Sequence, residues 1–308
     1  MTRRLASIEY FLHSLEKSID RPSNLIFLTK AACVQKRKAN ITQQVLLPPT
    51  WGVNIDDVKV MFCEIQIVER GKRKARIGSL MRMLPIPVLH RYVTVPVVTQ
   101  VIHISCMTSD WVWISDADYL ILTNMEGKLM HYLIRKCVHY GAHSVNSNND
   151  LIYIDNEDNI KKLSKDNKTE SILIEKTEQC TPSCVYCSPC NGDLFVGMVV
   201  MEKGRSILFN ANVVRYNSNG QHIQTIRDYT DPAYITENRN GDIIVSDVKM
   251  GVVVSNCYGK HRFVYTGPEL GPTLSQYGIC TDAMSNILIC DNNTHTVQMI
   301  DKDGISFH

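Results

Sequence analysis

A cluster of four cysteines is the sharpest chemical signal in this sequence. Cys180, Cys184, Cys187 and Cys190 form a C-x3-C-x2-C-x2-C pattern. Thiolates at such short spacings can hold zinc or an iron–sulfur cluster. A structural zinc site more typically uses two separate C-x2-C pairs, and alternation along a strand would direct Cys184 and Cys187 to opposite faces. We therefore expect packed thiols and no metal or other cofactor, with metal binding by the four cysteines as the alternative.

The familiar signatures of enzymes are missing from the sequence. There is no G-x-S-x-G nucleophile elbow, no P-loop and no H-E-x-x-H motif, and the ten histidines are scattered singly. Four aspartates recur directly after apolar runs: Asp116, Asp155, Asp247 and Asp291. Carboxylates can serve in catalysis, but an aspartate at a strand end can also bond to the backbone of the following turn. We predict turn residues at these positions and a chain that is not an enzyme.

The composition is that of a globular protein with two unlike parts. The 308 residues carry a formal net charge of +2, and 44% of them are hydrophobic. Residues 1–95 contain 16 basic and 7 acidic side chains, whereas residues 96–308 contain 17 and 24, so two different structures are expected. No apolar run approaches the ~20 residues of a membrane-spanning helix, and Glu9, His13 and Glu16 interrupt the run that a secretory signal needs. We expect a cytoplasmic protein that does not contact a membrane.

The first third is predicted to hold one helix and a long linker. Apolar residues recur on one helical stripe at Leu5, Ile8, Leu12, Leu15 and Ile19. Since Pro22 ends this pattern, we expect an amphipathic helix over residues 1–21, either packed on its own chain or forming the tail of a longer coiled coil. Residues 22–95 are interrupted by prolines and are predicted to be a basic, mostly irregular linker. Their basic run, Arg70–Arg76, fits a solvated linker, a nuclear-localisation signal or a nucleic-acid patch.

A repeat of short strands fills the remaining two-thirds of the chain. Each unit has an apolar run that often ends in Asp, a second apolar run, and a turn that contains Asn or Gly; in the fourth unit these are 243–247, 251–254 and 256–259. The equivalent positions are Asp116, Asp155, Gly197, Asp247 and Asp291, which are separated by 39, 42, 50 and 44 residues. This period is typical of β-propeller blades. We therefore predict an all-β propeller with about five recognisable blades over residues 96–308.

The units resemble NHL repeats. Residues 277–283, 287–291 and 297–301 carry this resemblance best, and the run 100–308 is similar to the NHL propellers of tripartite-motif (TRIM-like) proteins of the invertebrate type. The resemblance implies a propeller of usually six four-stranded blades. It also implies that full-length relatives, with a RING finger and B-box modules upstream, are E3 ubiquitin-protein ligases. Only Cys33 and Cys63 precede residue 100, which is too few for a RING, so this chain is expected to lack these modules and ligase activity.

Protein binding is the function that this resemblance implies. Loops before the innermost strands would gather on one face and place His139, Tyr140, Tyr229 and Tyr277 there as candidate partner-binding residues. Exposed tyrosine is a frequent hot-spot residue, although tyrosines also pack at blade junctions. The resemblance implies recognition of substrates for ubiquitin-dependent turnover and association with full-length TRIM-like proteins.

RNA binding in post-transcriptional regulation is the second function that the resemblance implies. Residues 96–308 are acidic overall, however, and lack the clustered positive charge that phosphates need. A third class, a propeller that hydrolyses sugars or esters, would need a metal or a carboxylate cluster in its channel. We expect a protein partner, with RNA as the alternative.

Five units leave one blade of the usual six unaccounted for. Residues 296–300 form the last predicted strand before a turn and one short outer strand. We therefore predict an open ring with a gap between the blade near residue 110 and the blade near residue 290, with tight closure of five blades as the alternative. Residues 93–98 would cover part of the exposed edge.

Overall fold

The computed structural model describes residues 59–64, 88–95, 98, 101–134, 140–200, 210–268, 271, 273–282 and 284–306. The predicted helix over residues 1–21, the basic run at 70–76 and His139 lie outside these ranges. Within them the chain forms strands and turns and no helix, in agreement with the predicted all-β class. Accordingly, this part of the chain contains no helix that is long and apolar enough to cross a membrane.

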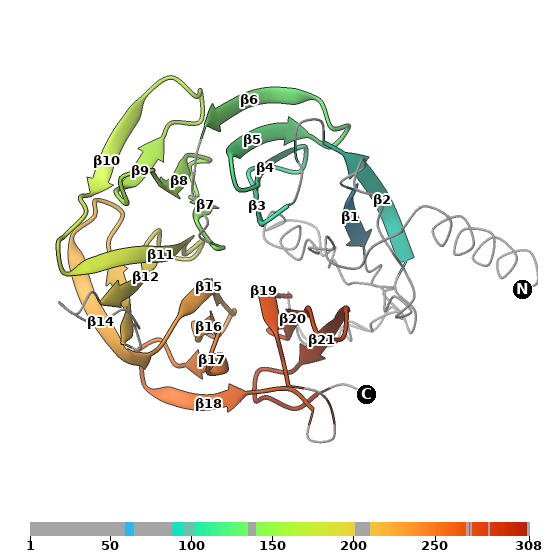
Figure 1. Cartoon of the computed structure of the whole chain (residues 1–308), viewed down its shortest axis with the longest axis vertical. Helices are drawn as coiled ribbons and strands as arrows, with labels where there is room; N and C mark the ends of the chain where they lie inside the picture. Colours follow the sequence, from blue (N-terminus) through green and yellow to red (C-terminus); the bar gives the residue numbers. More distant parts are fainter. Residues whose placement is uncertain are drawn as a thin grey trace, which may run out of the picture.

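The strands form five antiparallel blades around one axis (Figure 1), as predicted. The first blade contains β3 (His103–Cys106), β4 (Trp111–Ser115), β5 (Tyr119–Asn124) and β6 (Leu129–Ile134), and the second contains β7 (His143–Val145), β8 (Leu151–Ile154), β9 (Ile160–Leu163) and β10 (Glu170–Ile174). The third contains β11 (Cys180–Cys187), β12 (Leu194–Val200), β13 (Ala211–Tyr216) and β14 (His222–Tyr229), and the fourth contains β15 (Pro232–Glu237), β16 (Ile243–Asp247), β17 (Gly251–Ser255) and β18 (His261–Tyr265). The fifth has three strands, β19 (Gln276–Thr281), β20 (Ile287–Asp291) and β21 (Thr296–Ile300), and an isolated bridge from Ile300 to Ser306 stands where the other blades have a fourth strand.

The middle strands of a blade are apolar on both faces because each blade packs against its neighbours. Every residue of β16 and β17 is buried, whereas only Tyr265 is buried in the outermost strand β18. Four clusters between successive blades form the core. Each contains side chains from both blades, for example Trp113 and Tyr153, Ile154 and Val185, Phe195 and Ile243, and Ile244 and Ile287. Fully burying one such side chain contributes about 1.5–3 kcal/mol, so the ring is stabilised at its blade junctions.

Short polar turns connect the strands and follow one chemical pattern. In the turn between the first two strands of the fourth blade, the Asn238 side-chain oxygen accepts hydrogen bonds from the amides of Asn240 and Asp242, at 3.0 and 2.9 Å. The Asn238 amide group then donates to the Asp242 carboxylate at 2.9 Å. The turn also contains Gly241, whose φ of +78° suits glycine. The Asn and Gly signals in the sequence therefore mark real hairpin turns.

The fifth blade closes the same turn with the two partners exchanged. Here Asp282 accepts from the amides of Met284 and Asn286, both at 2.8 Å, and the Asn286 side chain donates back to the Asp282 carboxylate at 2.7 Å. Along the chain, Asn precedes Asp in the fourth blade, and Asp precedes Asn in the fifth. Either order supplies one carboxylate acceptor and one side-chain amide donor for the hydrogen bond across the turn.

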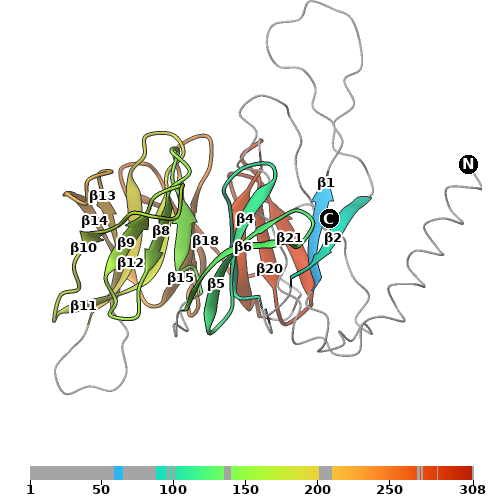
Figure 2. The ribbon, with the colours of Figure 1, turned by 90° about the horizontal axis from the view of Figure 1, so that it is seen from above.

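A two-stranded ribbon lies in the sector where the sequence predicted a gap in the ring. β1 (Lys59–Glu64) pairs with β2 (Val88–Thr94), and Figures 1 and 2 place this ribbon in the sector between the first and fifth blades. Both strands fall in the region that the sequence predicted to be mostly irregular. Val95, Val98 and Val101 follow the ribbon and pack on the first blade in a cluster with Ile104 and Ile114. The segment predicted to cover an edge therefore covers part of the face of this blade.

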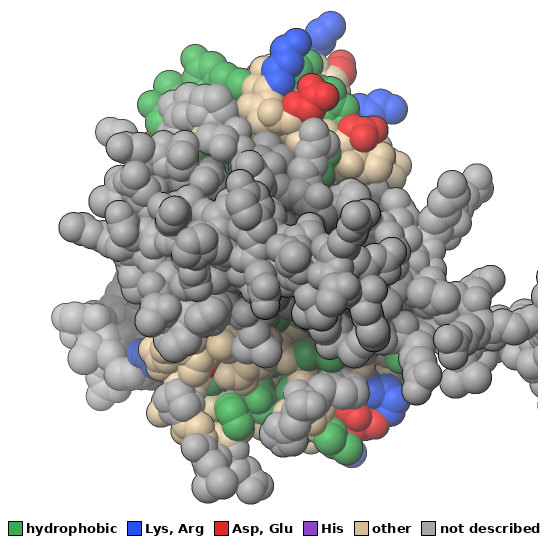
Figure 3. Space-filling model, turned by 90° about the vertical axis from the view of Figure 1, so that its right-hand side faces the viewer, with side chains coloured by type: hydrophobic (Ala, Val, Ile, Leu, Met, Phe, Trp, Pro, Cys, Tyr) green, Lys and Arg blue, Asp and Glu red, His purple; other side chains and the backbone are tan. Residues whose placement is uncertain are grey.

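The outermost strand of the first blade is unusually apolar. Figure 3 views this side of the molecule and shows hydrophobic side chains at the top, where β6 lies. Four of its apolar side chains are exposed, from 38% for Leu129 to 67% for Ile134. β6 carries no Asp, Glu, Lys or Arg, whereas β10, β14 and β18 each carry at least one.

Candidate functional site

A row of aromatic side chains crosses the middle of the propeller. It lies at the end of the propeller where the innermost strands begin. The ring centroids of His143 and His103 are 4.5 Å apart, and those of His103 and Tyr234 are 5.4 Å apart. The row continues from Tyr234 to Tyr140 at 6.2 Å and from Tyr140 to Tyr277 at 5.2 Å. These side chains come from β3, β7, β15, β19 and the turn before β7. We call the outer part of this row, Tyr140, Tyr234 and Tyr277, the mouth.

The mouth presents neutral phenol groups. Burial raises the pKa of Tyr234 well above its ordinary value, and its hydroxyl donates a hydrogen bond of 2.9 Å to the carbonyl oxygen of Ile102. Burial also raises the pKa of Tyr140, with further contributions from Tyr277 and Asp231. Phenols that stay protonated can donate and accept hydrogen bonds, and their rings offer apolar area.

The residues predicted for a partner-binding face do not all lie at one place in the structure. Tyr140 and Tyr277 lie together, half-buried, at the mouth. Tyr229 is only 3% exposed and packs between the third and fourth blades with Ile235, which corrects its predicted place on a binding face. Tyr234 belongs to the mouth but was not predicted. Its position inside the apolar run of β15 gave no sign that its hydroxyl reaches across the ring.

The recurring aspartates fix the loops around the mouth. Asp247 accepts hydrogen bonds from the backbone amides of Thr230 and Asp231, at 2.7 and 2.9 Å, just before β15 begins. Asp291 holds Ser275, before β19, in the same way at 3.1 Å. Asp116 and Asp155 accept from amides of their own turns: Asp118, Tyr119, Glu157 and Asn159. The structure thus places all four as turn residues, as predicted.

The third blade has Gly197 where the other blades have aspartate. A Cβ atom at this position would lie 2.6 Å from the Cys184 sulfur and 2.8 Å from the Ser183 hydroxyl oxygen. The Ser183 hydroxyl donates instead to the Pro232 carbonyl oxygen at 2.7 Å and links the third blade to the fourth. The close approach of these two β11 side chains to Gly197 on β12 leaves no room for an aspartate, which explains the departure from the repeat.

The four cysteines spread along β11 and past its end. Cys184 is buried in the cluster with Phe195, and Cys187 in the cluster with Ile154, so they face different blade junctions. Cys180 is half-buried and Cys190 is exposed. Burial raises the pKa of the Cys184 thiol to about 12. In the described ranges, no three His, Cys, Asp or Glu side chains are grouped so that they could hold a metal ion.

Two serine–histidine contacts lie at the junction of the first and second blades. His143 Nε2 lies 3.2 Å from Ser115 Oγ, and Ser105 Oγ lies 3.4 Å from His103 Nε2. This pairing is the geometry of an activated nucleophile. However, Ser115 is 3% exposed and His143 is 0% exposed, so neither group can reach a substrate in this state. The Ser115–His143 contact joins β4 to β7. The His143 carbonyl oxygen joins β7 to β3, because it lies 2.9 Å from His103 Nε2 and accepts a hydrogen bond of 3.1 Å from Ser105 Oγ.

A carboxyl group with a perturbed pKa lies at the opposite end of the innermost strands. Glu237, the last residue of β15, accepts a hydrogen bond of 2.6 Å from the Ser188 hydroxyl of the third blade. Burial raises the pKa of Glu237, and this effect outweighs the opposing effects of Ser188 and Arg215. The contact joins two blades, but it places the Glu237 carboxylate where it is partly shielded from water.

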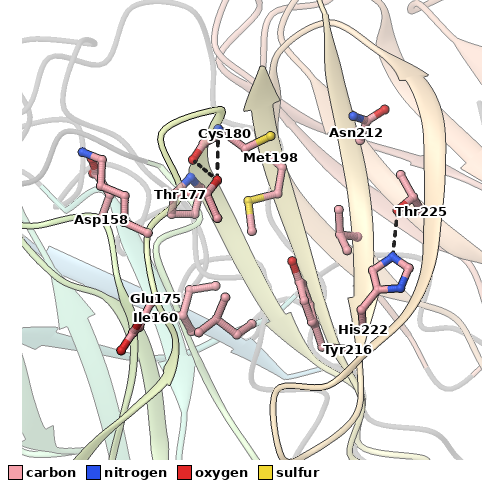
Figure 4. Close-up of a pocket in the computed structure, with 14 residues that line it drawn as sticks. Asp158, Ile160, Glu175, Thr177, Cys180, Met198, Asn212, Tyr216, His222 and Thr225 are labelled. Atoms are coloured by element: carbon pink, nitrogen blue, oxygen red, sulfur yellow. Dashed lines mark hydrogen bonds and ion pairs between the residues drawn. The ribbon is translucent and has the colours of Figure 1, made fainter. Parts of the chain in front are cut away.

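A pocket of about 270 Å³ opens between the second and third blades (Figure 4). Its apolar walls are Ile160, Ile174, Pro182, Met198 and Val214. Polar groups from both blades complete the lining: Asp158, Glu175, Lys176, Thr177, Cys180, Asn212, Tyr216, His222 and Thr225. The pocket was not predicted, because its lining comes from six strands whose register the sequence does not reveal.

The comparisons with known proteins show the fold of the chain. It matches no family model and no curated protein. Among solved structures, a gluconolactonase from Xanthomonas campestris is 11% identical with a TM-score of 0.53, covering 67% of this chain and 74% of that one. A protein of unknown function from Bacteroides caccae is 10% identical with a TM-score of 0.50, covering 65% and 72%. At these identities the likeness shows the propeller fold alone.

This likeness corrects one prediction. The missing motifs indicated that the chain is not an enzyme, yet the same fold occurs in a gluconolactonase, which is an enzyme. Familiar short motifs are therefore a poor guide to activity in this fold, since catalytic side chains can come from different strands around the ring. The NHL and tripartite-motif part of the predicted resemblance stays a hypothesis.

Proposed function

We propose that this propeller is a protein-interaction module whose partner binds at the mouth. The observation that carries the proposal is the half-buried pair of Tyr140 and Tyr277, with ring centroids 5.2 Å apart, over the buried Tyr234. Tyrosine supplies large contact area and a hydroxyl at low conformational cost, which makes it a frequent interface anchor.

The rigidity of the surrounding loops supports this proposal. Asp247 and Asp291 hold the loops that lead into β15 and β19, so the two sides of the mouth are fixed before a partner arrives. A preorganised surface binds more tightly because less conformational entropy is lost on association. RNA is less well suited to this surface, because the mouth holds neutral phenols beside Asp231 and residues 96–308 are acidic overall.

Affinity capture with a matched pair of variants tests the proposal. Tyr277→Ala removes one ring of the mouth, whereas Tyr258→Ala removes a ring that is 81% exposed in the turn between β17 and β18. Wild type and Tyr258→Ala are expected to recover the same proteins from a cell extract, and Tyr277→Ala is expected to lose them. Circular dichroism checks that all three are folded. Equal recovery by Tyr277→Ala, or recovery that ribonuclease abolishes, would count against a protein partner at the mouth.

The finer part of the hypothesis concerns ubiquitin-dependent turnover in the cytoplasm. It rests only on the NHL-like resemblance of residues 100–308, which is strongest at residues 277–301. It expects a full-length TRIM-like protein or a ligase substrate among the captured proteins. Mass spectrometry of the Tyr277-dependent fraction tests it. A fraction without any RING-containing protein or ubiquitinated partner would contradict this part and leave the mouth proposal standing.

A further inference from the structure

The pocket between the second and third blades has apolar walls on both sides. Ile160 and Ile174 come from β9 and β10, while Met198 and Val214 come from β12 and β13. Its volume of about 270 Å³ lies just below the range of pockets that hold drug-sized ligands. A pocket of this size suits one large side chain. A methionine in the wall favours an aromatic occupant, because thioether sulfur makes favourable contacts with aromatic rings.

Two polar groups in the pocket have hydrogen-bonding capacity to spare. Within the described part of the chain, neither the Tyr216 hydroxyl nor the Asn212 amide group has a hydrogen-bond partner. Figure 4 shows the Tyr216 hydroxyl directed upward, toward Met198 and Cys180. Burial, with a contribution from Cys180, raises the pKa of Tyr216, so this hydroxyl stays protonated and able both to accept and to donate.

The charged side chains at the rim of the pocket do not favour a charged occupant. Lys176 is paired with Asp158, with 2.6 Å between Nζ and Oδ2, and Figure 4 shows the Glu175 side chain directed away from the pocket. His222 is engaged with Thr225 at 2.9 Å. An uncharged ring with one polar hydrogen therefore matches the walls and the Tyr216 hydroxyl together. Tyrosine and tryptophan both carry such a ring, and tryptophan offers the larger apolar area.

The pocket also lies where a partner at the mouth can reach it. Cys180 and Pro182 line it and lie at the start of β11. This is the end of the innermost strands at which Tyr140 precedes β7 and Tyr277 lies on β19. An extended segment that leaves the mouth can thus pass over the junction of the second and third blades.

We infer that this pocket is an anchor site for a tryptophan side chain of the protein partner, an inference that rests on the proposed function. The ring enters between Met198 and Val214, and its N–H donates to the Tyr216 hydroxyl oxygen. Interface hot spots are enriched in tryptophan seated in such pockets, so this contact contributes strongly to partner binding.

Binding of two small probes to the full chain tests the inference. N-acetyl-tryptophan amide carries the indole N–H, and N-acetyl-phenylalanine amide carries a ring without it. With ¹³C-methyl-labelled methionine, both probes are expected to shift the Met198 signal, assigned through Met198→Leu. The signal of Met125, which packs in the first blade, is expected to stay in place. No shift at Met198 at millimolar probe would overturn the inference.

The Tyr216→Phe variant isolates the hydrogen bond. It keeps the ring and removes only the hydroxyl, so the tryptophan probe is expected to bind about three- to tenfold more weakly, while the phenylalanine probe binds as before. An equal loss for both probes would overturn the role of Tyr216. The Tyr277→Ala variant is expected to bind both probes normally, so failure of partner capture at the mouth and failure of the pocket are distinguishable.

Competition links the pocket to the partner. Millimolar tryptophan probe is expected to reduce recovery of the proteins whose capture depends on Tyr277, and the phenylalanine probe is expected to be less effective. Undiminished recovery, with the Met198 signal fully shifted, would contradict an anchor for the partner.

Discussion

Replacing Asp247 with alanine is expected to lower the free energy of unfolding by about 3 kcal/mol. Asp247 is 0% exposed, and its carboxylate accepts hydrogen bonds from four backbone amides. Two precede β15, those of Thr230 at 2.7 Å and Asp231 at 2.9 Å. Two belong to the turn before β17, those of Lys249 and Met250, both at 3.1 Å. Alanine removes the shared acceptor and releases the two segments from each other.

The magnitude follows from which amides water can reach. Lys249 is exposed, so water replaces the lost acceptor there at small cost. Thr230, Asp231 and Met250 are half-buried, and an amide left without a partner in such a site costs about 1 kcal/mol. Three such amides give roughly 3 kcal/mol, which corresponds to a fall in melting temperature of about 6–12 °C for a domain of 150–250 residues.

Thermal unfolding of the full chain, followed by circular dichroism, measures this change. Asp301→Ala is the matched control, since Asp301 accepts two amide hydrogen bonds, from Asp303 and Ile305 at 2.9 Å each, in an exposed turn of the fifth blade. That variant is expected to lose less than about 1 kcal/mol. If Asp247→Ala costs no more than Asp301→Ala, the reasoning that Asp247 joins two segments through half-buried amides is refuted.

Two further predictions concern ionisation. Because burial raises the pKa of Glu237 in the folded state, its charged form opposes folding, and stability is lost as the pH rises through the folded-state pKa. Glu237→Gln should therefore raise the melting temperature at pH 7.5, and this advantage should vanish below pH ~4, where both states of the wild type are protonated; an equal gain at both pH values would contradict the explanation. The Cys184 thiol, with a pKa of about 12, should resist iodoacetamide at pH 8 in the folded chain while the exposed Cys190 is alkylated, as peptide mass spectrometry can measure.

The fold was predictable because its signals are local. The strands β16 and β17 are continuous apolar runs, and the Asn–Gly turns mark their ends, so each hairpin can be recognised within about ten residues. Repetition of this unit then gave the number of blades. The two strands β1 and β2 do not belong to a repeated unit. Their pairing joins residues about thirty positions apart, so no local pattern marks them as a hairpin.

The candidate site was predictable only in part. The sequence predicted Tyr140, Tyr229 and Tyr277 in equivalent loops. Tyr140 and Tyr277 do lie at the mouth, but Tyr229 is the last residue of β14 and is buried, because its ring fills the junction with Ile235. Burial at a blade junction depends on the neighbouring blade and not on the local sequence. The contact of Tyr234 with Ile102 spans 132 positions in the chain, and no periodic pattern can reveal it.

The exchanged pair in the hairpin turns has a consequence for how this protein diverges. Asn238 with Asp242 and Asp282 with Asn286 make the same bridging hydrogen bond in opposite order. A compensating double substitution can therefore invert the pair in the fourth or fifth blade without changing the shape of the turn. A residue-by-residue comparison would count two mismatches, although the hydrogen bonds of the turn are the same. Two propellers can thus share such turns and differ at both positions, and the two solved propellers compared above share the fold with this chain at 10–11% identity.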